Sequence, residues 1–71
     1  MKKIKIIDLH GVRHDDVTPL LSNTFFWENI YEAEIITGGS DIMKRIVREW
    51  LEEHDMNYFE YLRKDSFLVL Q

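Results

Sequence analysis

Apolar residues follow two patterns along the chain, short runs typical of strands and longer stretches with helical spacing. The short runs predict four strands, at residues 4–10, 34–37, 57–62 and 67–70, the last two around a tight turn at residues 63–66. Helical spacing predicts two helices, at residues 15–29 and 40–54. The order βαβαββ implies right-handed crossovers and a parallel pair of strands. We therefore expect an α/β fold of the α+β two-layer type, a four-stranded mixed sheet with two helices on one face.

The first predicted helix has an ambiguous start and an apolar end. Either Asp15 or Thr18 caps it, and Pro19 falls in the first turn, where a missing N–H costs little. Phe26 and Trp27 lie off the apolar stripe of this helix, so its end is apolar on more than one side. Two interpretations stay open: additional core packing, or an exposed patch that meets a protein partner or a second copy of the chain.

The charges of the second predicted helix run against its dipole, which prefers the opposite order by about 0.3–1 kcal/mol for each well-placed charge. In order along the helix they are Lys44, Arg45, Arg48, Glu49, Glu52 and Glu53. Asp41 and the pairs Arg45–Glu49 and Arg48–Glu52 offset part of this cost. The pattern is either an ordinary solvated face or a helix start kept positive to meet an anion.

Composition narrows the class of protein. The 71 residues form a single small domain, residues 1–71, with 45% apolar and 31% charged residues. The absence of cysteine excludes a disulfide framework and a zinc–thiolate site, and it fits a cytoplasmic location. Lys2 and Lys3 precede a charged, alternating segment, so neither a signal peptide nor a membrane span is expected. A net charge of −4 by itself argues against a general nucleic-acid binder.

Candidate chemistry gathers where the predicted strands end. All three glycines, Gly11, Gly38 and Gly39, follow a strand and precede a helix, and ligands of α/β sheets bind beyond the carboxyl ends of parallel strands. Asp8 and His10 share strand parity, so their side chains leave the same face about 7 Å apart. The sequence therefore predicts a site at this edge of the sheet.

The residue types at this edge suit cleavage of a phosphodiester. His10 can move a proton near neutral pH, and Asp8 can orient it or the attacking water. Thr37 and the amides after Gly38 can hold a phosphate, while cationic charge stabilises the pentavalent intermediate. The simpler alternative is that Asp8 bonds loop amides and His10 merely ends a strand.

Five side chains within nine residues are potential metal ligands: Asp8, His10, His14, Asp15 and Asp16. A turn at Gly11 separates the two histidines, so their spacing has no geometric meaning, and the two later aspartates suit helix capping. We expect no resident cofactor or tight metal site, and Mg²⁺ only as an ion carried with a phosphate.

Three segments of the chain resemble the Smr domain, the small MutS-related module. "IDLHG" is similar to the L-D-L-H-G signature that opens this domain, "ITGGS" falls where the family has an H-G-x-G or T-G-x-G loop, and "MKRIVREWL" is similar to its L-R-x-x-V-x-x-W-L helix. The resemblance implies a fold like the C-terminal domain of translation initiation factor three. It also implies endonuclease activity on RNA or DNA, in some members on stalled ribosomes.

Residue by residue, the resemblance implies catalytic roles for Asp8 and His10 and places Thr37 and Gly38 in the second motif. In the helix motif it makes Lys44 the basic residue that follows the Leu position, which is Met43 here. Together with the edge argument, the candidates for binding substrate phosphate are Gly11, Arg13, Thr37, Gly38, Gly39, Ser40, Lys44 and Arg48. The chain departs from the family where Ser40 replaces a glycine, and "YLRKDSFLVL" lacks the glycine-rich stretch that family members carry before the final strand.

Two functions follow as hypotheses. The first is a minimal Smr-like endonuclease that cleaves RNA or structured DNA. The second is a non-catalytic Smr-like adaptor that binds a protein, a ribosome or nucleic acid through Phe26, Trp27 and the sheet surface. Ile4 and Ile6 share parity with Asp8 and are expected on the uncovered face of the sheet. They favour a homodimer or a protein partner, and no membrane is expected as a partner.

Overall fold

The computed structural model describes residues 4–28, 30 and 32–70. Its elements are β1 (Lys5–Asp8), α1 (His14–Ser22), a π-helical turn (Asn23–Trp27), β2 (Ala33–Ile36), α2 (Asp41–Glu53), β3 (Tyr58–Tyr61), a 3₁₀ turn (Leu62–Lys64) and β4 (Ser66–Val69). The expected order of strands and helices is confirmed, although β1 and β3 are shorter than expected and β2 and β4 begin one residue earlier. The expected end of the first helix, at residue 29, lies outside the described residues.

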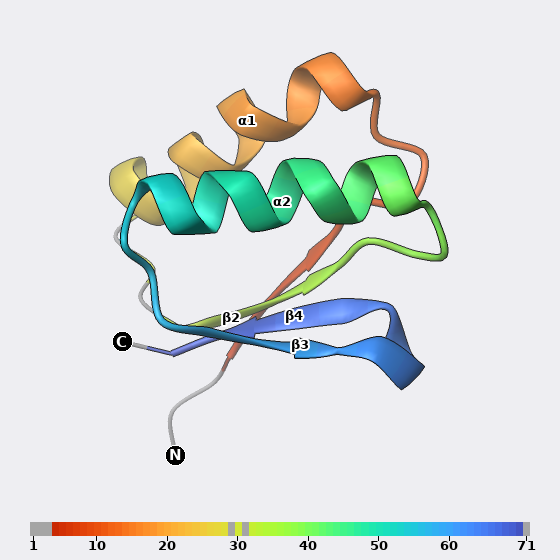
Figure 1. Cartoon of the computed structure of the whole chain (residues 1–71). Coiled ribbons are helices and arrows are strands. Elements are labelled where there is room, and N and C mark those ends of the chain that lie inside the picture. The colour runs from red at the N-terminus through yellow and green to blue at the C-terminus, as the bar shows by residue number, and fades with distance from the viewer. Residues whose placement is uncertain (1–3, 29, 31, 71) are drawn as a thin grey trace.

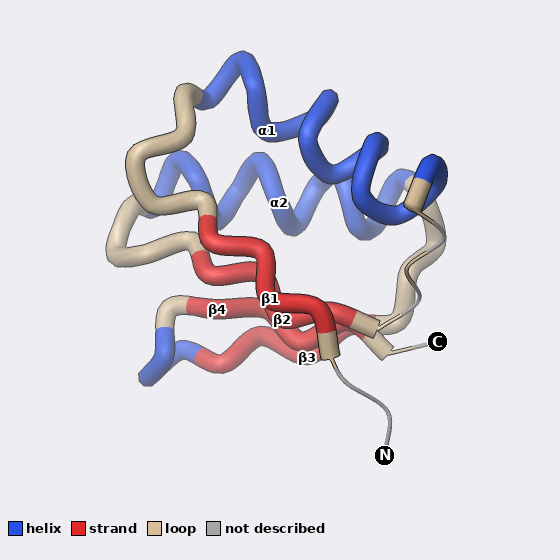
Figure 2. The backbone as a smooth tube through the Cα atoms, turned by 180° about the vertical axis from the view of Figure 1, so that it is seen from behind, coloured by secondary structure: helices blue, strands red, loops and turns tan. Residues whose placement is uncertain are grey.

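The four strands form one mixed sheet in the order β1-β2-β4-β3. β1 and β2 are parallel, and β4 pairs antiparallel with both β2 and β3. Both helices lie in one layer over a single face of this sheet (Figures 1 and 2). The expected α+β two-layer fold is therefore confirmed. Within the described residues, no helix has the length and apolar character needed to cross a bilayer.

The hydrophobic core fills the space between the helices and the inner face of the sheet. Alternate strand residues such as Ile7, Ile35 and Phe67 point toward the helices and are buried, as strand periodicity requires. The buried apolar residues of the helices are Val17, Leu21, Phe25, Met43, Val47, Trp50 and Leu51. The opposite face of the sheet keeps large apolar residues exposed, among them Ile4 and Ile6, as parity predicted.

The start of α1 differs from the sequence-based expectation. The helix begins at His14 after Arg13, which makes no side-chain capping bond, and Pro19 lies inside the helix. Capping by Asp15 or Thr18 is therefore wrong, and so is the placement of Pro19 in the first turn. Proline has no N–H to give to the carbonyl one turn earlier, and the chain then widens into the π-helical turn.

The π-helical turn carries the two aromatic residues that left two interpretations open. Phe26 packs beside the rings of Trp50 and His54, with centroids 5.9 and 5.4 Å away. Trp27 is 84% exposed. Phe26 is therefore partly packed against the helix layer, whereas Trp27 lies on the surface.

Gly38 turns the chain from β2 into α2 with a positive φ of 73°, a conformation that costs an L-residue about 1–2 kcal/mol. A Cβ atom at this position would meet nothing within 4 Å, so strain of the backbone is the only penalty. Gly38→Ala should lower the melting temperature by roughly 4–8 °C for each kcal/mol lost, measured by circular dichroism. Gly39→Ala is the matched control, because Gly39 has equal space and no positive φ. Equal losses in both variants would contradict this account.

Candidate functional site

The two segments that the sequence singled out leave the sheet at the same edge. β1 and β2 run parallel with Asp8 opposite Ile36, and the N–H of Leu9 donates to the carbonyl of Ile36 at 2.9 Å. Figure 2 shows the loops after both strands leaving together toward the helix layer. Residues 9–11 and 37–40 thus lie at the carboxyl ends of neighbouring strands.

The side chain of Asp8 is hydrogen-bonded to the main chain of His10. Oδ1 of Asp8 accepts a hydrogen bond from the N–H of His10 at 2.9 Å, which is the loop-amide contact of the simpler alternative. The imidazole of His10 is exposed and has no hydrogen bond or ion pair within the described part of the chain. The imidazole is therefore open to a ligand, while Asp8 shapes the turn that carries it.

Thr37 and Gly38 form hydrogen bonds to the β3–β4 hairpin and do not leave their donors open for a phosphate. The N–H groups of both residues donate to the carbonyl oxygen of Asp65, at 2.9 and 3.2 Å. The buried hydroxyl of Thr37 donates to the same oxygen at 2.9 Å. The Thr37 hydroxyl, expected to hold a phosphate, and these two N–H groups thus converge on one main-chain carbonyl, which Asp65 presents from a left-handed conformation with φ 50°.

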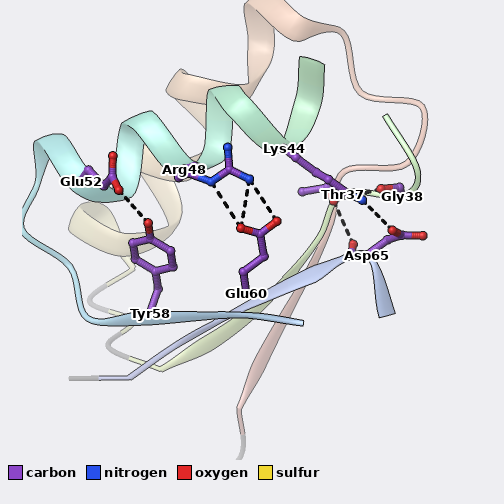
Figure 3. Close-up of polar contacts among 8 residues, drawn as sticks. All are labelled: Thr37, Gly38, Lys44, Arg48, Glu52, Tyr58, Glu60 and Asp65. Atoms are coloured by element: carbon purple, nitrogen blue, oxygen red, sulfur yellow. Dashed lines mark hydrogen bonds and ion pairs between the residues drawn. The ribbon is translucent and has the colours of Figure 1, made fainter. Parts of the chain in front are cut away.

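Three polar contacts, here named the polar ladder, join α2 to the hairpin formed by β3 and β4 (Figure 3). They are Lys44 Nζ to Asp65 Oδ1 at 2.7 Å, a two-oxygen contact of Arg48 with Glu60 at 3.0 Å, and the Tyr58 hydroxyl donating to Glu52 at 2.9 Å. Neither expected pair within the helix, Arg45–Glu49 or Arg48–Glu52, makes an ion pair in the described part of the chain. Arg48 has turned to a carboxylate of β3, and Glu52 accepts from a tyrosine instead.

The polar ladder changes the electrostatics at the start of α2. The hydrogen bond to Asp65 raises the pKa of Lys44, and the hydrogen bond to Glu60 raises the pKa of Arg48. Burial and then the bond to Glu52 raise the pKa of Tyr58. Lys44 and Arg48 are thus paired with carboxylates of the hairpin, whereas Arg13, the third cation assigned to substrate phosphate, is exposed and makes no ion pair within the described residues. No local sequence signal identifies these partners, which lie 21 and 12 residues away.

Several backbone N–H groups at the same edge have no hydrogen-bond acceptor in the described part of the chain. The hydroxyl of Ser40 caps α2 by accepting from the N–H of Met43 at 3.1 Å. The N–H groups of residues 39–42 have no acceptor within residues 4–28, 30 and 32–70. Gly11 and Arg13 follow β1 on the exposed surface. The unpaired N–H groups and the exposed side chain of Arg13, and not Lys44, are therefore the donors free to bind an anion in this state.

A metal ion finds no ready ligand set at this edge. Across the described chain, no three or more His, Asp or Glu side chains lie close enough together to hold one. The histidines and aspartates between residues 8 and 16 are exposed and separate.

Comparison with models of known protein families, with curated proteins and with solved structures gives no match. The resemblance to the Smr domain therefore stays a prediction from short motifs. The function has to be inferred from the side chains at this edge and from the surfaces around them.

Removal of Lys44 should make stability less sensitive to alkaline pH. Its pKa in the folded chain lies above the ordinary 10.5, because Asp65 accepts its hydrogen bond. The stabilisation is therefore complete below pH 10.5 and is lost as the pH rises through the folded value. Urea denaturation between about pH 9 and 12 should show a smaller fall in unfolding free energy for Lys44→Met than for the wild type.

Lys64→Met is the matched control for this measurement. Lys64 is exposed and has no carboxylate partner within the described residues. This variant should follow the wild-type curve. Parallel curves for wild type and Lys44→Met would show that the pair with Asp65 does not stabilise the fold.

Proposed function

We propose that this chain is a small Smr-like endonuclease that cleaves phosphodiester bonds in RNA or structured DNA. One observation carries the proposal. The exposed, unpartnered imidazole of His10 lies on the turn held by Asp8, at the edge where α2 presents unpaired N–H groups. A proton acceptor and anion-binding donors at one edge are the groups that phosphodiester cleavage requires.

The proposed reaction is attack of water on phosphorus. His10 takes a proton from the water as the new bond between oxygen and phosphorus forms. The bond from phosphorus to the leaving sugar oxygen breaks, and solvent supplies the proton that this oxygen needs. Asp8 holds the turn through one carboxylate oxygen and offers the other to the water or the imidazole. The N–H groups of residues 39–42 bind the non-bridging phosphate oxygens.

The polar ladder gives Lys44 a conditional part in this reaction. In the free protein, Asp65 neutralises Lys44, whose side chain is only 17% exposed. A substrate phosphate near the start of α2 competes with the Asp65 carboxylate for the same ammonium group. Substrate binding therefore depends on how readily this exchange takes place, and we expect weak, salt-sensitive affinity.

The second hypothesis, a non-catalytic adaptor of the cytoplasm, draws on the same ion pairs. A chain with net charge −4 in which Lys44 and Arg48 are already paired has reduced attraction for nucleic acid. Binding of RNA or DNA without cleavage, or no binding at all, supports this hypothesis over the first.

His10→Ala should reduce cleavage of labelled RNA and DNA about 10²- to 10⁴-fold, because it removes the proton acceptor. The assay uses pure protein with and without Mg²⁺, and circular dichroism verifies the fold. His14→Ala is the matched control, because His14 is another exposed histidine nearby, and it should cleave at the wild-type rate. Cleavage that survives His10→Ala at full rate would assign the activity to another site or to a contaminant.

Two variants of Asp8 separate its structural part from its chemical part. Asn retains an oxygen that accepts from the N–H of His10, whereas Ala removes it. Full activity of Asp8→Asn with loss in Asp8→Ala assigns Asp8 to holding the turn. Loss in both variants assigns the carboxylate charge to the reaction.

Asp65→Asn should strengthen binding of single-stranded RNA by roughly 3- to 10-fold at low salt, because it frees Lys44 without removing the side chain. The slope of log affinity against log salt should steepen by about 0.7 for the one added phosphate contact. Fluorescence anisotropy at several salt concentrations measures both. Asp55→Asn is the matched control, since Asp55 has the same charge and a similar φ of 52°. Equal effects of both variants would mean that only net charge matters.

A further inference from the structure

The sheet face opposite the helices, here named the open face, consists of two rows that cross all four strands. One row is Ile6, Glu34, Leu68 and Phe59, and the other is Asp8, Ile36, Ser66 and Tyr61. Both helices lie on the other side of the sheet (Figures 1 and 2), and no described residue forms a layer over these rows. Ile6 is 53% exposed and Phe59 is 59% exposed, while Ile4 and Leu70 extend the apolar surface.

A single carboxylate lies in the middle of this apolar surface. Glu34 is on the central strand β2, flanked across the sheet by Ile6 and Leu68, and it is half-buried. Its Oε2 accepts from the hydroxyl of Ser66 at 3.0 Å, and no lysine or arginine of the described chain pairs with it. The other acidic residue in the two rows is Asp8. The open face is thus apolar with a negative centre.

We propose that the open face binds an amphipathic helix of a protein partner, whose apolar side covers Ile6 and Phe59 and whose central Lys or Arg pairs with Glu34. The inner face of the same sheet already accepts amphipathic helices, which shows that helix-on-sheet packing suits its twist and spacing. A cation facing Glu34 satisfies a carboxylate that would otherwise lose water without compensation. This inference does not depend on the proposed endonuclease activity.

Charge favours such a helix over the other candidate occupants. A second copy of the chain, packed face to face, would set the carboxylates of Glu34 and Asp8 against carboxylates, which disfavours that pairing. Nucleic acid would bring phosphates to the same two carboxylates, and Lys64, whose Nζ lies 5.5 Å from the ring of Tyr61 on β3, is two strands away from Glu34. An apolar helix surface with one central positive charge complements both features of the open face.

The test uses two synthetic helical peptides of about 18 residues, about 27 Å long, that share one leucine-rich face. One peptide has Lys at the centre of that face, and the other has Glu. The wild type should bind the Lys peptide about tenfold more tightly than the Glu peptide, a difference of about 1.4 kcal/mol. Glu34→Lys should reverse the preference, and Glu34→Gln should abolish it. Calorimetric titration gives the affinities, and circular dichroism verifies that each variant is folded.

Matched surface variants locate the binding. Phe59→Asp should weaken binding of the Lys peptide at least about tenfold, because it puts a charge into the apolar contact. Ile42→Asp should leave binding unchanged, since Ile42 is equally exposed, at 56%, but lies on α2. Absence of binding, equal affinity for both peptides, or equal loss in the two variants would overturn the proposal. Self-association of the wild type that Phe59→Asp abolishes would also overturn it, by identifying a second copy as the occupant.

Discussion

The polar ladder between α2 and the β3–β4 hairpin is the constraint on which the candidate site depends. The three helix residues of the ladder, Lys44, Arg48 and Glu52, lie one turn apart and therefore on the same side of α2. On that side they contact Asp65, Glu60 and Tyr58, respectively. The carbonyl of Asp65 also accepts from Thr37 and Gly38 and thereby joins the loop after β2 to the hairpin. The cations nearest the site therefore have two uses, because the groups that would attract an anion also hold the hairpin against the helix.

The open face and the candidate site are neighbours that share a residue. Asp8 closes one row of the open face, and its carboxylate holds the turn that carries His10. A helix packed on the open face would lie beside that turn and would limit the motion of its backbone. Recognition of a protein and chemistry on a phosphate are thus compatible uses of one small sheet, each on its own surface.

Local patterns were enough to predict the layers, the strand directions and the edge at which the glycines gather. They predicted the exposure of Ile6, because strand periodicity decides which side chain faces the core. They failed where a partner is distant in sequence. Arg48 has an acidic neighbour one turn away and another on β3, and only the three-dimensional arrangement decides that Glu60 binds it. The register of α1 failed for a similar reason, since Asp15, Thr18 and Pro19 allow more than one helix start.

The position of β4 at the centre of the sheet determines the order in which the chain can assemble. Ser66–Val69 is the last described strand in sequence, yet it is hydrogen-bonded to β2 on one side and to β3 on the other. Until this segment has been synthesised, β2 lacks its antiparallel neighbour and β3 has no strand to pair with. The four-stranded sheet therefore cannot form from the first sixty or so residues alone. It forms only after Ser66–Val69, an interior strand that follows the other three in sequence, has been synthesised.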